Sequence, residues 1–261
     1  MAKGNARGSD YPKLVVMKKT VSLLTGFLLI IISLHAQKKQ PKFLTELSFG
    51  PSFPIGMFAA TTYNDKHEIP GFAKTGLGAH LSVGYYLNKS VGLLLSSGYT
   101  VHPQDEDAYR NFVETSFPDI TVTRLEVKSW KTVKLMGGGF LITPLTSDGE
   151  LVLLTKLTAG VSKSAYPKRE FYGSSPDGTT TVSSLVDETP LPWSFCYQVS
   201  LAPKYSFSRN WYVFLDISSF NTTAKKDFSY TIGANPTQTI TIKYKYKQAT
   251  VNALVGIGVR F

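Results

Sequence analysis

The residues of this chain that could carry out chemistry are few and widely spaced. A single cysteine, Cys196, excludes an internal disulfide and a cysteine-rich zinc site. One of the four histidines, His35, falls in an apolar N-terminal segment, which leaves few ligands for any other metal centre. We therefore expect this protein to hold no metal and no cofactor.

The best candidates for nucleophilic catalysis are His80 and Ser82, which share one face of an extended segment because they are two residues apart. A serine nucleophile needs a base and a third group that orients the base, and no motif supplies that group. We therefore assign no catalytic residue and interpret His80 as a packed or hydrated side chain. The run Asp105-Glu106-Asp107 lacks the spacing of a calcium-binding loop and is typical of a solvated loop.

The elements that must position these residues are β-strands. Apolar residues alternate with small or polar ones repeatedly after Gln37, and no segment there has convincing helical periodicity. The alternation predicts eight strands, at 43–54, 76–87, 91–101, within 120–143, at 151–162, 191–207 and 211–220, and within 239–261.

The fourth strand has the least certain register. Lys131 falls on the same parity as Leu125, Val127, Val133 and Leu135. Either a bulge shifts the phase near residue 130, or part of this strand projects beyond the apolar zone.

The connections between these strands alternate strictly between long and short. The long ones are about 55–75, 102–119, 163–190 and 221–238, and the short ones are 88–90, 144–150 and 208–210. Consecutive connections of an up-and-down barrel lie on opposite rims, so all long loops would gather on one rim. Bacterial outer-membrane barrels have this arrangement, with short periplasmic turns and long external loops.

The polar face of the strands decides which side of the barrel meets solvent or lipid. It consists mostly of glycine and serine, which suits the crowded lumen of an eight-stranded barrel, whereas the outside of a soluble barrel needs charged residues. Aromatic residues also cluster near strand ends, as at Tyr85-Tyr86, Tyr99, Trp193, Tyr205 and Trp211-Tyr212, the positions of a membrane-interface girdle. We predict an all-β fold, an eight-stranded up-and-down antiparallel transmembrane β-barrel.

The N-terminal segment has the layout of an export signal. Met17-Lys18-Lys19 precedes the apolar run 21–34 and the small residue Ala36. We expect residues 1–16 to be an upstream extension, 17–36 a signal peptide and 37–261 the barrel domain. The net charge of +10 falls to +6, from 23 basic and 17 acidic residues, without residues 1–36, and the remainder is too dispersed to predict nucleic-acid binding.

A charged set inside the barrel is the main candidate site. The alternation points the side chains of its members into the lumen, in the half of the barrel near the short turns. Both positive and negative charges are present, as ion pairing inside a barrel requires. We expect a lumen charge network of Glu46, Lys156, Lys204, Asp216 and Arg260. The alternative is that Glu46, Lys204 and Arg260 are solvated at the periplasmic rim.

The Gly-punctuated strand 76–87, its tight turn, the export signal and the ending Val255-Gly256-Ile257-Gly258-Val259-Arg260-Phe261 resemble the small outer-membrane β-barrel domain family of the PorT-like kind from the Bacteroidota. The resemblance covers about residues 43–261. It implies residence in the outer membrane of a Gram-negative cell, among its lipids. It also implies that Phe261 is the signal read by the barrel assembly machinery.

Together these features predict a non-enzymatic outer-membrane protein with a structural, adhesion or docking role, whose long loops could contact a protein or surface ligand. Two alternatives stay open. One is an outer-membrane lipid-modifying enzyme, and the other is a soluble periplasmic lipocalin-like barrel that binds a small ligand.

Overall fold

The computed structural model describes residues 41–62, 68–175, 181–232 and 238–261. Lys42–Arg260 form one compact unit. The expected upstream extension and signal peptide, residues 1–36, lie outside the described residues.

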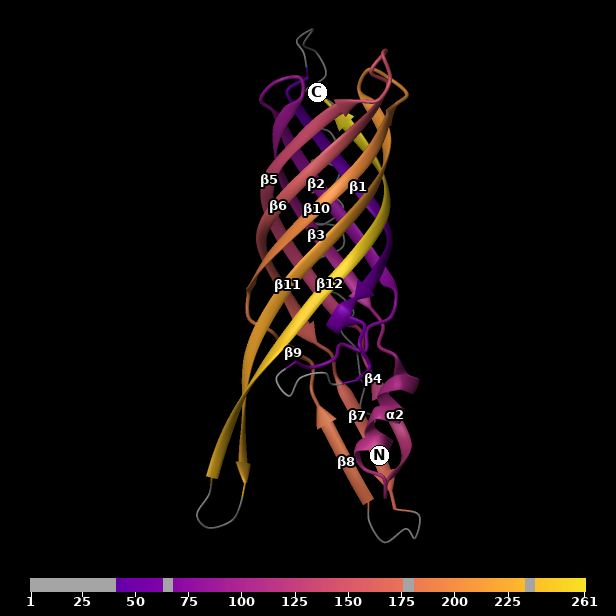
Figure 1. Cartoon of the computed structure of the whole chain (residues 1–261), viewed down its shortest axis with the longest axis vertical. Helices are drawn as coiled ribbons and strands as arrows, with labels where there is room; N and C mark the ends of the chain where they lie inside the picture. The colour runs from indigo at the N-terminus through magenta and orange to yellow at the C-terminus, as the bar shows by residue number, and fades with distance from the viewer. Residues whose placement is uncertain (1–40, 63–67, 176–180, 233–237) are drawn as a thin grey trace, which may run out of the picture. The chain divides into compact units, whose positions relative to one another are not determined.

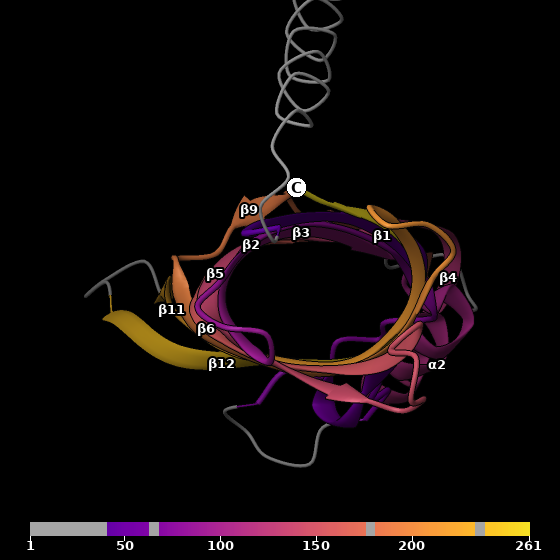
Figure 2. The same ribbon diagram turned by 90° about the horizontal axis from the view of Figure 1, so that it is seen from above.

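Eight antiparallel strands form a closed barrel (Figures 1 and 2), as the sequence predicted. Each barrel strand pairs with the next one along the chain, β12 pairs with β1, and the pairing of β6 with β10 completes the ring. The barrel strands are β1 (Phe43–Ile55), β2 (Gly76–Tyr86), β3 (Val91–His102), β5 (Trp130–Pro144), β6 (Leu151–Tyr166), β10 (Ser194–Ser206), β11 (Trp211–Ile232) and β12 (Gln238–Arg260).

The tight turns on one rim are fixed by short polar side chains. The Asn88 carboxamide oxygen accepts hydrogen bonds from the backbone N–H groups of Ser90 and Val91, at 2.8 and 2.9 Å. The Ser208 hydroxyl accepts one from the N–H of Trp211 at 3.0 Å. Asn and Ser satisfy the backbone locally in this way, which is why the sequence signals these turns clearly.

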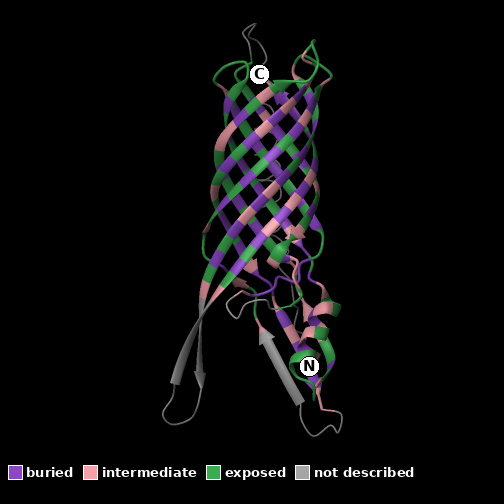
Figure 3. Ribbon diagram, viewed as in Figure 1, coloured by how far each residue is buried: buried purple, intermediate pink, exposed green. Residues whose placement is uncertain are grey.

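The two faces of the wall are those that the parity predicted. Outward side chains such as Leu77, Phe49 and Leu215 are exposed apolar groups, and inward ones are buried, which gives the banded pattern of Figure 3. The predicted aromatic girdle needs one correction, because Tyr86 and Tyr212 belong to the lumen face and Tyr212 is fully buried. No helix in the described residues is long and apolar enough to cross a membrane.

The prediction that the chain lacks helices is wrong, because parts of the long connections fold. They contain η2 (Gly56–Phe58), α2 (Glu106–Ser116), β4 (Thr121–Val127), β7 (Arg169–Ser174), β8 (Thr181–Val186) and the short β9 (Thr189–Pro190), which pairs with β6. The strands β4, β7 and β8 form a separate antiparallel sheet, in the order β4-β7-β8. We call α2 with its caps Asp105 and Phe117, this sheet and the segment 68–75 the external module, because its sheet is separate from the barrel sheet.

The uncertain fourth strand proves to be two strands in two sheets. Leu125 and Val127 belong to β4 of the external module, whereas Val133 and Leu135 face outward from the barrel strand β5. Lys131, at the start of β5, forms an exposed ion pair with Glu188 at 3.1 Å. Neither alternative describes this segment, because the chain leaves one sheet after Val127 and enters another at Trp130.

The predicted long connection 221–238 is also wrong for most of its length. Strands β11 and β12 continue their pairing as far as Ile232 and Gln238, so they leave the barrel as a two-stranded ribbon. Two neighbouring strands can continue their hydrogen bonding beyond the end of the barrel. The residues just after Phe220 are mostly polar, so they show no alternation of apolar and polar residues that would predict a strand.

Candidate functional site

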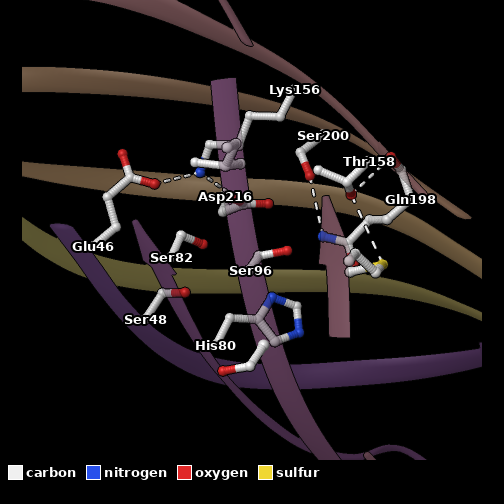
Figure 4. Close-up of a pocket in the computed structure, with 13 residues that line it drawn as sticks. Glu46, Ser48, His80, Ser82, Ser96, Lys156, Thr158, Gln198, Ser200 and Asp216 are labelled. Atoms are coloured by element: carbon white, nitrogen blue, oxygen red, sulfur yellow. Dashed lines mark hydrogen bonds and ion pairs between the residues drawn. The ribbon is translucent and has the colours of Figure 1, made fainter. Parts of the chain in front are cut away.

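The lumen contains a buried ion cluster (Figure 4). The Lys156 ammonium on β6 donates to the Glu46 carboxylate at 2.6 Å and to the Asp216 carboxylate at 3.0 Å. The Tyr212 hydroxyl donates to the other oxygen of Glu46 at 3.1 Å. All four side chains are almost fully buried, so one cation here links three strands that lie far apart in sequence. Pairing offsets part of the cost of removing these charges from water.

The other two members of the predicted network lie outside this cluster. The Lys204 ammonium has no hydrogen-bond partner among the described residues and lies 3.4 Å from the centroid of the Tyr212 ring. Arg260, at the end of β12, donates from Nε to the backbone carbonyl of Arg209 at 2.9 Å. The alternative of a solvated rim does not describe Glu46 or Lys204, which are 2% and 1% exposed.

A buried cation that our sequence reading missed is Lys134 on β5. Its ammonium donates to the Gln198 side-chain carbonyl at 2.7 Å and lies 4.3 Å from the centroid of the Phe220 ring. Gly98 makes room for it, because a Cβ there would lie 2.6 Å from the Lys134 side chain and 2.7 Å from the His80 ring. The signal was present, since Lys134 alternates with Val133 and Leu135.

His80 and Ser82 line the same small cavity as the ion cluster. No hydrogen bond joins them in the described chain, and His80 Nε2 has no partner there. The cavity is about 10 Å³, room for about one water molecule and too small for a lipid substrate.

A different serine and histidine are in contact at the other end of the lumen. Ser52 Oγ lies 3.2 Å from His102 Nε2, and His102 Nδ1 lies 3.2 Å from the Lys74 carbonyl oxygen. Ser52 also donates to the Asn252 carboxamide oxygen at 2.6 Å, so its single proton is already engaged. Both Ser52 and His102 are buried, at 0% and 1% exposed, which leaves a substrate no access to this hydroxyl.

Apolar side chains close the lumen on both sides of its polar middle. Near the tight turns lies a cluster of Leu44, Leu94, Phe140, Leu154, Ala202, Tyr212 and Phe214. At the mouth away from the turns, Trp130 packs edge-to-face against Phe58 and Tyr166, with ring centroids 5.6 and 5.3 Å apart. The polar middle therefore lies between two packed apolar layers.

The external module has a core of its own, formed by Phe72, Tyr109, Val113, Val122 and Phe171. Phe72 adopts the left-handed backbone conformation, with φ of 52°, which is strained for a bulky residue. Hydrogen bonds hold it there, from its N–H to the Ala60 carbonyl at 3.1 Å and from the Asp105 N–H to its carbonyl at 2.7 Å. Packing thus offsets the local strain.

Arg169 of β7 is buried inside this module at 4% exposed. Its Nε donates to the Gln104 side-chain carbonyl at 2.7 Å, and its guanidinium carbon lies 4.6, 5.0 and 5.2 Å from the ring centroids of Tyr109, Tyr166 and Phe72. A guanidinium suits such a site because it is planar and weakly hydrated. Since Tyr166 ends the barrel strand β6, Arg169 links the module to the barrel.

Helix α2 begins at a side-chain cap and protects a sheet edge. Asp105, which the sequence placed in a solvated acidic loop, accepts a hydrogen bond from the Ala108 N–H at 3.1 Å and thereby caps the helix. Arg110 donates to the Val122 carbonyl at 2.6 Å, and Glu114 accepts from the Val122 N–H at 3.1 Å. These two side chains occupy the free edge of β4 at this residue, which blocks pairing with another strand there.

Comparison with known proteins finds no matching family model and no matching curated protein. Among solved structures, Ail, the attachment invasion locus protein of Yersinia pestis, is 14% identical, covering 85% of this chain and 100% of its own, with a TM-score of 0.39. Neisserial surface protein A is 10% identical, covering 84% and 97%, with a TM-score of 0.40. A major outer membrane protein from Thermus thermophilus is 11% identical, covering 85% and 100%, with a TM-score of 0.41.

These likenesses are too distant to carry an argument about activity, so location follows from the molecule itself. An exposed apolar wall with a buried polar lumen is the reverse of a soluble barrel, and it is stable only where lipid covers the outside. The short turns on one rim and the folded connections on the other are the arrangement of bacterial outer-membrane barrels. The chain is an eight-stranded β-barrel of the outer membrane.

Proposed function

We propose that this protein is a non-enzymatic outer-membrane barrel that docks a protein or surface ligand through its external module. The observation that carries the proposal is that the module is folded, with its own core and the buried Arg169. A prefolded surface loses less conformational entropy on binding than flexible loops do. Exposed aromatic side chains such as Phe117 and Tyr172, at 52% and 41% exposed, provide contact area.

Adhesion of cells that carry the protein tests this role. A non-adherent strain producing the wild-type chain should bind to other bacterial or host cell surfaces more than the empty strain does. The double variant Phe117→Ser/Tyr172→Ser should lose that gain, whereas Leu145→Ser, an equally exposed apolar residue beside a tight turn, should keep it. No gain from the wild type, or an equal gain from the double variant, contradicts docking by the module.

A closed lumen is the second part of the proposal. Apolar layers around Phe140 and Trp130 lie on both sides of the polar middle, and the cavity beside the ion cluster has room for about one water. The purified barrel should therefore show no stable ion conductance in a planar lipid bilayer. Steady conductance by the wild type would contradict a purely structural barrel and favour a channel.

The PorT-like assignment and the role of Phe261 as an assembly signal stay proposals that rest on the resemblance. Phe261 directly follows β12, whose Val255 and Ile257 present exposed apolar side chains. Deleting one apolar residue removes only about 1.5 to 3 kcal/mol of burial, so refolding into detergent should stay near normal. A signal for the assembly machinery predicts a much larger loss from the outer membrane of cells, and unchanged levels there would remove this role.

A further inference from the structure

A groove of about 410 Å³ crosses the outer wall of the barrel near the rim opposite the tight turns. Phe195 and Tyr197 of β10 lie on one side of it, and Ala249 and Lys247 of β12 lie on the other. Met57 of η2 also lines it. The groove therefore has apolar side chains on its flanks, the polar residues Asn221 and Thr223 of β11 between them, and the Lys247 ammonium group at one end.

The strand register places this groove at the edge of the apolar belt. On β11 the outward residues Leu215 and Ile217 are apolar, and the next outward positions are Ser219, Asn221, Thr223 and Lys225. Asn221 lies opposite Tyr197 and Ala249, and Thr223 lies opposite Lys247. This is the depth at which hydrocarbon gives way to lipid headgroups.

Above the groove, the ribbon of β11 and β12 presents a group of lysines. Lys225 and Lys245 are directly opposite each other in the register, and both are exposed. Like charges in this arrangement destabilise a strand pair. Lys247, two residues along the same face, pairs with Glu68, whereas Lys225 and Lys245 have no ion pair with any residue that the structure describes.

Lys163 of β6 adds a fourth positive charge on the β10 side. Its ammonium lies 5.7 Å from the centroid of the Trp193 ring, next to the aromatic wall of the groove. A groove with apolar flanks at membrane depth and several ammonium groups along its outer edge matches an amphiphile with an anionic head. A soluble acidic protein would contact the lysines but would not fill a groove that faces the hydrocarbon.

We propose that the groove binds a phosphorylated lipid of the outer leaflet, with an acyl chain against Phe195, Tyr197 and Ala249 and a phosphate group at Lys225 and Lys245. A phosphate between these two ammonium groups would relieve their mutual repulsion. Lysine provides point charges that suit phosphate, and cations near a membrane surface attract anionic headgroups. The site lies on the barrel wall and its ribbon, so it does not depend on docking by the external module.

The test uses the full chain refolded in detergent, with native mass spectrometry to measure binding of bisphosphorylated lipid A, dephosphorylated lipid A and inorganic phosphate. We expect the phosphorylated lipid to bind about tenfold more tightly than the dephosphorylated one, and inorganic phosphate alone to bind much more weakly than either. Equal binding of the two lipids, or binding of free phosphate as strong as that of the lipid, would overturn the proposal.

Two variants separate the parts of the site. Lys225→Gln/Lys245→Gln should lower affinity for the phosphorylated lipid about tenfold and leave the dephosphorylated lipid unaffected. Ala249→Phe should weaken both lipids, because its ring occupies the groove. Lys89→Gln, at a tight turn on the opposite rim, is the control and should bind as the wild type does. Unchanged affinity in the double lysine variant would show that the lysines hold no headgroup.

Discussion

The lumen and the external module both bury cations, but among the described residues only the lumen cation Lys156 is buried against carboxylates. In the lumen, Lys156 forms ion pairs with two carboxylates, Glu46 and Asp216. The surrounding barrel wall is a closed ring of hydrogen-bonded strands. In the module, Arg169 is buried without an ion pair in the described chain, and it is held by Gln104 and three aromatic rings.

The difference follows from what surrounds each region. The barrel meets lipid on its outside, so its polar groups must turn inward and satisfy one another. The module meets water, so it can bury an apolar core as small soluble domains do and use one guanidinium to join its segments. The same chain thus folds by two opposite arrangements of polar and apolar residues.

The largest effect should come from breaking the lumen cluster. Lys156→Ala leaves Glu46 and Asp216 buried and unpaired, and should destabilise the barrel by about 3 to 5 kcal/mol. Urea unfolding of the protein refolded into lipid vesicles measures this. Lys163→Ala, an exposed position on the same strand, is the matched control.

A triple variant sharpens the same point. Glu46→Gln/Lys156→Met/Asp216→Asn removes all three charges, so it should recover most of the stability lost in Lys156→Ala. If Lys156→Ala unfolds at the same urea concentration as the wild type, the cluster does not stabilise the barrel.

The next effect tests the two outer surfaces. Leu215→Arg places a charge against lipid at mid-strand and should cost about 2 to 4 kcal/mol in the vesicle refolding assay. Phe117→Arg replaces an exposed apolar residue at the end of α2 on the module, and it should change stability by no more than about 0.5 kcal/mol. Equal tolerance at both positions would mean that Leu215 does not face lipid.

The sequence predicted the barrel well because each strand has a lipid face and a lumen face. In β2, the outward Leu77, Leu81 and Val83 alternate with the inward Gly78, His80 and Ser82, so both fold and orientation follow from parity. Parity also placed Glu46, Lys156 and Asp216 on one face. It could not say which of them touch, since strand tilt and side-chain length decide whether Lys156 reaches both acids while Lys204 reaches neither.

The sequence did not predict the external module, and its residues explain why. Helix α2 has apolar residues at Tyr109, Phe112 and Val113 after an Asp105 cap, a helical signal spread over only three turns. The strand β4 alternates as a barrel strand does, so period alone could not assign it to another sheet. The partners of Arg169 lie as far as 98 residues away in sequence, and no local pattern reveals them.

A smaller and local effect is expected from Arg169→Met. The change removes the charged hydrogen bond to Gln104 and should cost about 1.5 to 3 kcal/mol, confined to the module. Hydrogen exchange should therefore speed up in β4 and β7 while the barrel keeps its urea midpoint. Arg124→Met, where an exposed guanidinium lies 5.8 Å from the Tyr172 ring centroid, is the control and should change exchange little. A lowered barrel midpoint in Arg169→Met would mean that the two regions unfold as one.

The smallest effect belongs to the surface charges of the module. The Lys168 ammonium donates to Glu170 at 2.6 Å, and this contact, helped by the Tyr172 hydroxyl, lowers the pKa of Glu170 below its ordinary value of 4.5. A carboxyl whose pKa is lowered by folding contributes stability above its unfolded pKa and loses it as the pH falls through the folded pKa. The module should therefore keep its hydrogen-exchange protection from pH 7 to about pH 5 and weaken only in stronger acid.

Carboxyl NMR titration should show the pKa of Glu170 rising in Lys168→Met. Lys131→Met, which breaks the ion pair with Glu188 instead, should leave the pKa of Glu170 unchanged. An unchanged pKa of Glu170 in Lys168→Met would show that this ion pair is not formed in solution. The apolar core and Arg169 would then be what stabilises the module.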